Sequence, residues 1–358
     1  MFTLSLCMIV KDEEAVLGRC LSSVCDIADE IIIVDTGSKD RTKEIAAGFS
    51  AKVYDFPWID DFSAARNFSF SKANCEYIMW LDADDVLLPG DARELAKLKA
   101  DGIDADAVMM RYNTSVGADG KPAFYYYRER LVKRSRGFLW QEPVHEYIAV
   151  VGKTVTSEIA VTHQKPGDRP SRRNLDIYRR ELKKRGSLTP RGMYYYAREL
   201  KDNAYFARAA TWFKRFLQSG KGWSEDCICA CAELAACLQR LGKPGKALAA
   251  LFKSFEYDTP RPVVCCRIGY FFKDGDSLKS AVYWFERALT APPPSSSFGF
   301  TQPQYSGFVP AIELAVCYDR LGNTVLAQRY NELAASFNPD SAAVESNRKY
   351  FAAKLGEK

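Results

Sequence analysis

Two patterns of apolar and polar residues alternate along the first 165 residues. Short apolar runs rich in β-branched residues are typical of strands, and between them apolar residues recur at the three- and four-residue spacing of a helix. This alternation produces βαβ units and a mostly parallel sheet. The expected strands are Leu4 to Val10, Glu30 to Val34, Ala51 to Asp55 and Tyr77 to Leu81; the expected helices are Glu13 to Val24, Arg41 to Phe49 and Phe62 to Lys72.

Beyond Pro190 the pattern is helical throughout and repeats itself. Corresponding alanines lie 38, 34 and 46 residues apart, close to the period of about 34 residues of tetratricopeptide repeats. The last interval contains Pro292 to Phe308, which is rich in Pro, Ser and Gly and is expected to be a loop. The alanines are Ala209, Ala247, Ala281 and Ala327, and the aromatic residues expected to fill the space between repeats are Trp212, Phe213, Trp284, Phe285 and Tyr330.

These patterns predict three parts of the chain. Residues 1–165 form an α/β domain, 166–190 a basic connecting helix and 191–358 an all-α domain of helical repeats. Nine basic residues lie in this connecting segment and at the residue just before it, and such a run is commonly a solvated face. They are Lys165, Arg169, Arg172, Arg173, Arg179, Arg180, Lys183, Lys184 and Arg185.

Composition narrows the class of protein. Hydrophobic residues at 47% and charged residues at 27% argue against disorder, and a net charge of +5 is too small to imply nucleic acid as a partner. No apolar run is long enough for a membrane span, and Leu4 to Val10 reads as a strand without a basic leader, so no secretory signal is expected. Eleven cysteines without a CxxC pair indicate buried thiols in a reducing cytoplasm. The spacing of Cys227, Cys229 and Cys231 does not favour zinc.

Polar residues follow three of the expected strands: Lys11-Asp12, Asp35 to Ser38 and Asp82 to Asp85. Ligands of open α/β sheets bind beyond the carboxyl ends of the strands, so these segments are expected to converge on one cleft. Asp82 and Asp84 are two residues apart, and on extended chain their carboxylates face the same side. They suit Mg²⁺ or Mn²⁺ together with a nucleotide diphosphate. The alternative is a polar turn in which Asp85 begins a loop.

Four segments, Leu6 to Glu14, Glu30 to Thr42, Ala64 to Asn67 and Trp80 to Asp85, resemble in order and spacing the inverting glycosyltransferases of family two. The resemblance covers residues 4–165 and implies the GT-A fold and a nucleoside diphosphate sugar as donor, with UDP favoured. Together with the helical repeats, the chain resembles the tetratricopeptide-bearing branch, which includes the glycocin S-glycosyltransferases and other enzymes that modify peptides or saccharides.

The resemblance assigns roles around the donor. Ile9, Lys11 and Glu13 would frame the base, and Asp35 would accept hydrogen bonds from the base or ribose, unless it caps the following helix. Arg66 would contact the pyrophosphate or base, since a guanidinium offers fixed donors to phosphate oxygens. Its alternative is a surface ion pair with a nearby Asp. Arg172 would reach the diphosphate.

The chain has two histidines, His145 and His163. His163 lies in a segment resembling the family's end-of-domain motif and would complete the metal's ligands after Asp84 and Asp82. Inversion needs a base for the acceptor's proton, and the family's Glu-Asp pair is here Glu142-Pro143. The candidates, in order, are His145, Glu146 and Glu142. A structural role stays open for either histidine.

Other readings are weighed against this one. A sugar nucleotidyltransferase needs a Gly-rich loop after the first strand, which this chain lacks. A catalytically weak scaffold would bind peptides through the repeats. The acceptor is a peptide, a protein or a saccharide, and the repeats would bind it or build a homodimer. A second basic cluster would attract an acidic acceptor or keep the protein soluble: Arg128, Arg130, Lys133, Arg134 and Arg136.

Overall fold

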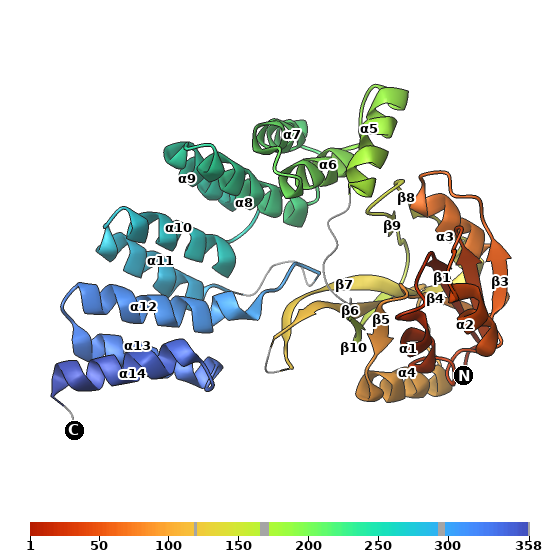
Figure 1. The fold of residues 1–358 in the computed structure, drawn as a ribbon, viewed down its shortest axis with the longest axis horizontal. Helices are drawn as coiled ribbons and strands as arrows, with labels where there is room; N and C mark the ends of the chain where they lie inside the picture. The colour runs from red at the N-terminus through yellow and green to blue at the C-terminus, as the bar shows by residue number, and fades with distance from the viewer. Residues whose placement is uncertain (118–119, 165–171, 293–297, 357–358) are drawn as a thin grey trace. The chain divides into compact units, whose positions relative to one another are not determined.

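The computed structural model describes residues 1–117, 120–164, 172–292 and 298–356. The chain divides into two compact units, Met1–Ser187 and Leu188–Lys358. Figure 1 shows strands and helices alternating in the first unit and a run of helices in the second. The two units are described separately.

In the described residues of the first unit, eight strands form one sheet in the order β3-β2-β1-β4-β7-β6-β10-β5. β3, β2, β1 and β4 are parallel, as are β6 and β10, whereas β7 runs antiparallel to β4 and β6, and β5 runs antiparallel to β10. The mostly parallel sheet is confirmed. The strands are β1 Leu4–Val10, β2 Glu30–Asp35, β3 Lys52–Asp55, β4 Tyr77–Trp80, β5 Asp85–Leu87, β6 Ala107–Val116, β7 Pro122–Lys133 and β10 Thr154–His163.

Helices cover both faces of this sheet, as the central strands, buried on both sides, require. Leu17 and Leu21 of α1 pack with Leu95 of α4 in one core, and Phe70 of α3 packs with Trp140 in the other. A small ribbon of β8 and β9 lies beside α3. The bounds are α1 Leu17–Ser22, α2 Thr42–Gly48, α3 Phe62–Phe70, α4 Pro89–Asp101, β8 Trp140–Gln141, the 3₁₀ turn Arg134–Arg136 and β9 Tyr147–Ile148.

The first expected helix, Glu13 to Val24, is too long. α1 begins only at Leu17, and it is preceded by a turn in which the backbone amides of Glu13 and Glu14 donate to the side chains of Thr42 and Asp40. The sequence pattern also gave no hint of the long β6–β7 hairpin.

In the described part of the basic connecting segment, Arg173 to Arg185 form the helix α5, which belongs to the first unit. The Tyr178 hydroxyl donates to the Val144 carbonyl at 3.2 Å, and Arg180 pairs with Asp60 at 2.9 Å. Lys165 and Arg169 lie outside the described residues.

The second unit is a series of antiparallel helix pairs, as the repeating pattern predicts. Ala209, Ala247, Ala281 and Ala327 are fully buried, each on the second helix of a pair. The helices are α6 Pro190–Asp202, α7 Phe206–Ser219, α8 Ser224–Arg240, α9 Pro244–Lys253, α10 Pro262–Asp274, α11 Leu278–Thr290, α12 Phe308–Arg320, α13 Thr324–Phe337 and α14 Ala342–Leu355; the 3₁₀ turns are Ser254–Glu256 and Pro303–Ser306.

Aromatic residues and one glycine set the contact between these helices. Phe213 and Phe285 are fully buried, while Trp212, Trp284 and Tyr330 are half-buried. A Cβ on Gly269 of α10 would lie 2.8 Å from the Phe285 ring, so the absence of a side chain lets the two helices approach. In the described part of the insertion predicted as a loop, 292 and 298–308, only Phe308 is in an α-helix, as the first residue of α12; residues 293–297 lie outside the described residues.

All eleven cysteines are free, and most are buried. Among the described residues, Cys227, Cys229 and Cys231 of α8 belong to no cluster of potential metal ligands. No helix among the residues that the structure describes has both the length and the hydropathy needed to cross a membrane.

Candidate active site

The loops after β1 and β2 are joined to each other, as expected from their place at one edge of the sheet. Asp12 N donates to Ser38 Oγ at 2.9 Å, and Lys39 N donates to Asp12 Oδ1 at 2.7 Å. Asp12 has a φ of 55°, a left-handed conformation that these bonds hold in place. Among the residues predicted here to frame a base, Ile9 is half-buried at the end of β1 and Lys11 is exposed.

Asp35 closes the turn after β2. Its Oδ1 accepts from the backbone N–H groups of Gly37 and Ser38, both at 2.9 Å, so the alternative that it caps the next helix is wrong. Asp40 bonds to the Thr42 amide there instead. The second oxygen of Asp35, Oδ2, is buried and has no hydrogen-bond partner among the described residues. A buried acceptor without a partner is costly, which fits an oxygen that serves a ligand.

The segment Asp82 to Asp85 forms a tight turn between β4 and β5. Asp85 N donates to the Asp82 carbonyl at 3.0 Å, and Asp82 N donates back to Asp85 Oδ2 at 3.1 Å. Asp85 begins a strand and is fully buried, so the alternative in which it begins a loop is wrong. Because β5 pairs with β10, His163 lies opposite Asp85 in the sheet.

This pairing brings Asp84, Asp85 and His163 together, with potential ligand atoms all within 4.8 Å of one another. His163 Nδ1 lies 3.4 Å from both Asp84 Oδ1 and Asp85 Oδ1. Hydrogen bonds to Asp84 and then Asp85 outweigh burial and raise the pKa of His163 to about 10. Two carboxylates and an imidazole form a donor set that suits Mn²⁺ better than Mg²⁺.

Glu13 adds negative charge beside this cluster. Burial, followed by the charges of Asp84 and Asp82, raises the pKa of Glu13 to about 7. The carboxylate that follows β1 therefore interacts with the carboxylates that follow β4, as expected if both loops lie at one edge of the sheet. Such an excess of acidic groups favours a bound cation.

Asp82 is held by Arg66 of α3 rather than by His163. Arg66 Nη2 donates to Asp82 Oδ1, and Arg66 Nε donates to Glu146 Oε1, both at 2.6 Å. Its guanidinium lies over the rings of Trp80 and Trp140, which contact each other, at 5.0 and 4.7 Å from their centroids. Burial opposes ionisation of Asp82, but the charge of Arg66 outweighs it and lowers the pKa of Asp82. The alternative of an ion pair with a nearby Asp is confirmed, although Arg66 is buried and Asp82 half-buried rather than on the surface.

The three candidate bases lie on one strained segment. Glu142 and His145 have φ angles of 73° and 54°, which few L-residues adopt. The Glu142 carbonyl accepts from the Ser63 hydroxyl of α3, and the His145 ring stacks on Tyr178 at 6.3 Å. Of the three side chains, only that of Glu146 is seen joined to the Arg66–Asp82 pair.

Arg172 is exposed and immediately precedes α5. Arg173, the first residue of α5, lies over the Phe62 ring at 4.7 Å, and its charge partly opposes the rise in the pKa of Glu13. It is therefore Arg173 that the described contacts bring near the site. The functional roles given to all these residues stay predictions.

Arg128 and Arg130 of the second basic cluster differ from the expectation of an exposed surface, whereas Arg134 and Arg136 are exposed. Arg130 is fully buried and pairs with Asp85 at 3.0 Å, and Arg128 is largely buried beside Glu129 at 3.1 Å. Sequence analysis missed this because Arg128 and Arg130 are read as exposed by residue type. Their spacing of two in a strand, with Tyr126 before them, was the available signal for one shared face.

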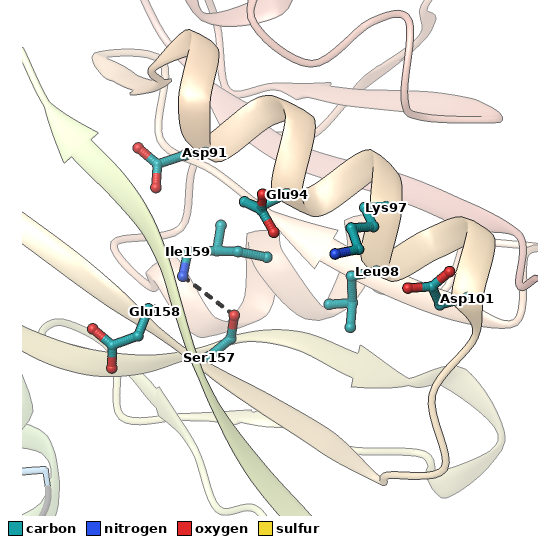
Figure 2. Close-up of a pocket in the computed structure, with 8 residues that line it drawn as sticks. All are labelled: Asp91, Glu94, Lys97, Leu98, Asp101, Ser157, Glu158 and Ile159. Carbon is teal, nitrogen blue, oxygen red and sulfur yellow. Dashed lines mark hydrogen bonds between the residues drawn. The ribbon is translucent and has the colours of Figure 1, made fainter.

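A pocket of about 370 Å³ lies between α4 and β10 (Figure 2). Figure 2 shows acidic side chains around it, with Lys97 among them. None of the predicted site residues lines it. Its lining residues are Asp91, Glu94, Lys97, Leu98, Asp101, Ser157, Glu158 and Ile159.

Comparison with known proteins matches residues 5–150 to the family described as Glycosyl transferase family 2. A TPR repeat-containing protein of Synechococcus elongatus is 37% identical over 194 residues, which is 52% of this chain and 45% of that protein. The SPbeta prophage-derived glycosyltransferase SunS of Bacillus subtilis is 34% identical over 104 residues, 27% of this chain and 23% of SunS.

Among solved structures, YrrB, described as a TPR protein with an unusual peptide-binding site, is 17% identical with a TM-score of 0.38, over 49% of this chain and 81% of YrrB. The chain spans less than half the length of the two relatives named above. The cluster of acidic residues and His163 at the sheet edge lies in the unit that contains the family match. Residues 5–150 form a glycosyl transferase family 2 domain, and helical repeats of the tetratricopeptide type follow it.

Proposed function

We propose that the first unit transfers a sugar from a nucleoside diphosphate donor, a UDP-sugar, to a peptide, protein or saccharide acceptor, with inversion at the anomeric carbon. The observation that carries this proposal is the meeting of Asp84 and His163 at the carboxyl edge of the sheet in a family 2 domain. That edge is where open α/β sheets bind ligands.

Asp84 and His163 are the proposed ligands of a divalent cation, with Asp82 beside them. Mn²⁺ is favoured over Mg²⁺ because one donor is an imidazole. When bound, the cation would supply positive charge against the leaving diphosphate. The acidic surroundings support this assignment, since the charges of Asp84 and Asp82 add to burial in raising the pKa of Glu13.

The nucleotide would lie over the loops after β1 and β2. Ile9, Lys11 and Glu13 would contact the base, and the partnerless Oδ2 of Asp35 supports its role as an acceptor for the base or ribose. Arg172 would contact the diphosphate from the segment before α5. Arg66, already bonded to Asp82 and Glu146, orients these two carboxylates.

For the base we favour Glu146 over His145 and Glu142, because only Glu146 is seen joined to the Arg66–Asp82 pair. The acceptor's nucleophile would attack the anomeric carbon while its proton passes to the Glu146 carboxylate, and the diphosphate would leave from the opposite face. Arg66 keeps this carboxylate in place. Replacing a general base typically costs 10² to 10⁴ in rate, so Glu146→Gln is expected to lower kcat by about that factor, more than His145→Gln.

The helical repeats would hold the acceptor. Stacked helix pairs offer an extended concave surface, which suits a peptide or protein acceptor. A homodimer through the repeats is the other arrangement that we propose to test, by the mass of the protein in solution.

The test is sugar transfer and thermal shift with UDP- and GDP-sugars, each with Mn²⁺ and with EDTA. The expected result is a shift of Tm by one nucleotide only, dependent on Mn²⁺, and a product of inverted anomeric configuration by NMR. Asp84→Asn and His163→Asn should abolish the metal-dependent shift. Asp101→Asn, which removes an exposed carboxylate of α4, should change nothing. Transfer that proceeds equally in EDTA and in Asp84→Asn contradicts the proposal, and no turnover with tight peptide binding would favour the scaffold.

A further inference from the structure

Arg130 places a positive charge at the centre of the first unit. Its side chain is fully buried, and Nη1 lies 3.0 Å from Asp85 Oδ2 and donates to the Trp80 carbonyl at 3.2 Å. The guanidinium is sandwiched between the Trp80 and Tyr112 rings, 3.8 and 4.3 Å from their centroids. These contacts hold the Asp85 carboxylate in place from the buried interior of the first unit.

Asp85 in turn contacts the groups that flank the proposed cation site. Its Oδ2 accepts from Asp82 N at 3.1 Å, and its Oδ1 accepts from the Tyr112 hydroxyl at 3.0 Å. Oδ1 also lies 3.4 Å from His163 Nδ1, and the same hydroxyl is 3.3 Å from that nitrogen. Both oxygens of Asp85 are thus engaged within the protein, one toward the Asp82 turn and one toward His163.

Stability alone does not explain this pair. Arg130 Nε and Nη2 are buried without a hydrogen-bond partner among the described residues. Burying two charges costs desolvation energy, and an apolar pair of similar volume is often as stable or more stable. An incompletely satisfied cation at this position is therefore better explained by what its partner carboxylate does.

We propose that Asp85, fixed by Arg130 and Tyr112, is a positioning residue that orients Asp84 and His163 toward a divalent cation and is not itself a ligand. The proposal rests on the metal dependence in the proposed function. A histidine whose Nδ1 is held by an outer carboxylate, here Asp85 Oδ1 at 3.4 Å, offers its Nε2 to a metal, and such an outer partner fixes the ring orientation and the tautomer.

The experiment is Mn²⁺ binding to the full chain without nucleotide, measured by the EPR signal of free Mn²⁺ and by calorimetry. Tyr112→Phe removes only the hydroxyl that joins Asp85 to His163, and should weaken the Kd for Mn²⁺ about tenfold. Asp85→Asn should weaken it about 10- to 100-fold, the range typical of outer-shell partners, without changing the stoichiometry. Arg130→Lys keeps the charge and should lose less than Asp85→Asn.

Tyr77→Phe is the matched control, because Tyr77 is also buried and its hydroxyl donates to two carbonyls, those of Ile103 and Ala105. It should lower Tm about as much as Tyr112→Phe and leave the Kd unchanged. Binding lost completely in Asp85→Asn, as expected for Asp84→Asn, would make Asp85 a ligand and overturn the proposal.

The two levels of the argument fail differently. If the wild-type protein binds no Mn²⁺, the metal dependence of the proposed function is wrong, and the positioning role is wrong with it. If the wild-type protein binds Mn²⁺ and Tyr112→Phe and Asp85→Asn keep the wild-type Kd, only the positioning role is overturned. Should Asp85→Asn fail to fold, Tyr112→Phe still decides between these outcomes.

Discussion

Arg66→Met removes the charge that joins the two carboxylates at the sheet edge. In the wild-type protein, the Arg66 side chain is 8% exposed and that of Glu146 is 12% exposed, with 2.6 Å between Nε and Oε1. Breaking a buried pair by removing one partner costs about 3 to 5 kcal/mol, because the other charge stays buried without compensation. The lost contacts with Trp80 and Trp140 are part of the same effect.

This loss converts into a large change in melting temperature. For a domain of this size, 1 kcal/mol shifts Tm by about 2 to 4 °C, so Arg66→Met should lower the Tm of the first unit by about 6 to 20 °C at pH 7. The loss should shrink in acid. Arg66 lowers the pKa of Asp82, and a lowered pKa contributes stability that is present above the ordinary value of 3.8 and is lost as pH falls through the folded value.

The assay is differential scanning calorimetry, in which the transition of the repeat unit serves as an internal reference. Arg41→Met is the matched control, because Arg41 pairs with Glu14 at 3.5 Å but is 75% exposed. Exposed pairs contribute about 0 to 1 kcal/mol, so its Tm should stay within about 4 °C of the wild type. If the first unit has the same Tm in the Arg66→Met protein as in the Arg41→Met protein, the reasoning is refuted.

Three further outcomes are expected from the same calorimetric measurement. Gly269→Ala should destabilise the repeat unit by about 1 to 3 kcal/mol, because its Cβ would meet the Phe285 ring at 2.8 Å. Gly90→Ala in α4 has open space around its Cβ and should not destabilise the first unit. Asp226→Asn should stabilise that unit by about 1 kcal/mol at pH 8 and less at pH 4: burial raises the pKa of Asp226 to about 6, so its destabilising effect develops as pH rises from 4 to 6. Asp61→Ala removes the cap of α3 and should cost the first unit about 1 kcal/mol. Unchanged transitions would contradict each expectation.

Strands and loops of the first half were predictable because their signals are local. β1 follows the expected bounds, Leu4–Val10, since seven consecutive apolar and small residues suit a strand buried on both faces. The helical repeats were predictable for a similar reason, since each pair of helices repeats one short pattern. The meeting of the β1, β2 and β4 ends then follows from the topology of a parallel sheet.

The remaining features depend on contacts between residues far apart in the sequence. Asp85 is buried by Arg130, and the two are 45 positions apart in a chain whose local patterns give each a surface residue type. The β6–β7 hairpin was missed because its apolar and aromatic residues do not alternate cleanly. The expected first helix was too long, because side chains of the next loop hold Glu13 and Glu14 in the turn that precedes α1.

The three aspartates of the turn after β4 show what such long-range contacts decide. Asp82 faces Arg66 and Asp85 faces Arg130, so each has a guanidinium as partner. Asp84 has His163 instead, a group that can give up its proton to become a metal ligand, whereas a guanidinium cannot. Their spacing of two in the sequence gives Asp82 and Asp84 the same predicted role, but their basic partners in the structure differ. A cation therefore competes with only a proton for Asp84 and His163, and with an arginine for Asp82 or Asp85, which makes Asp84 and His163 the first ligands to test.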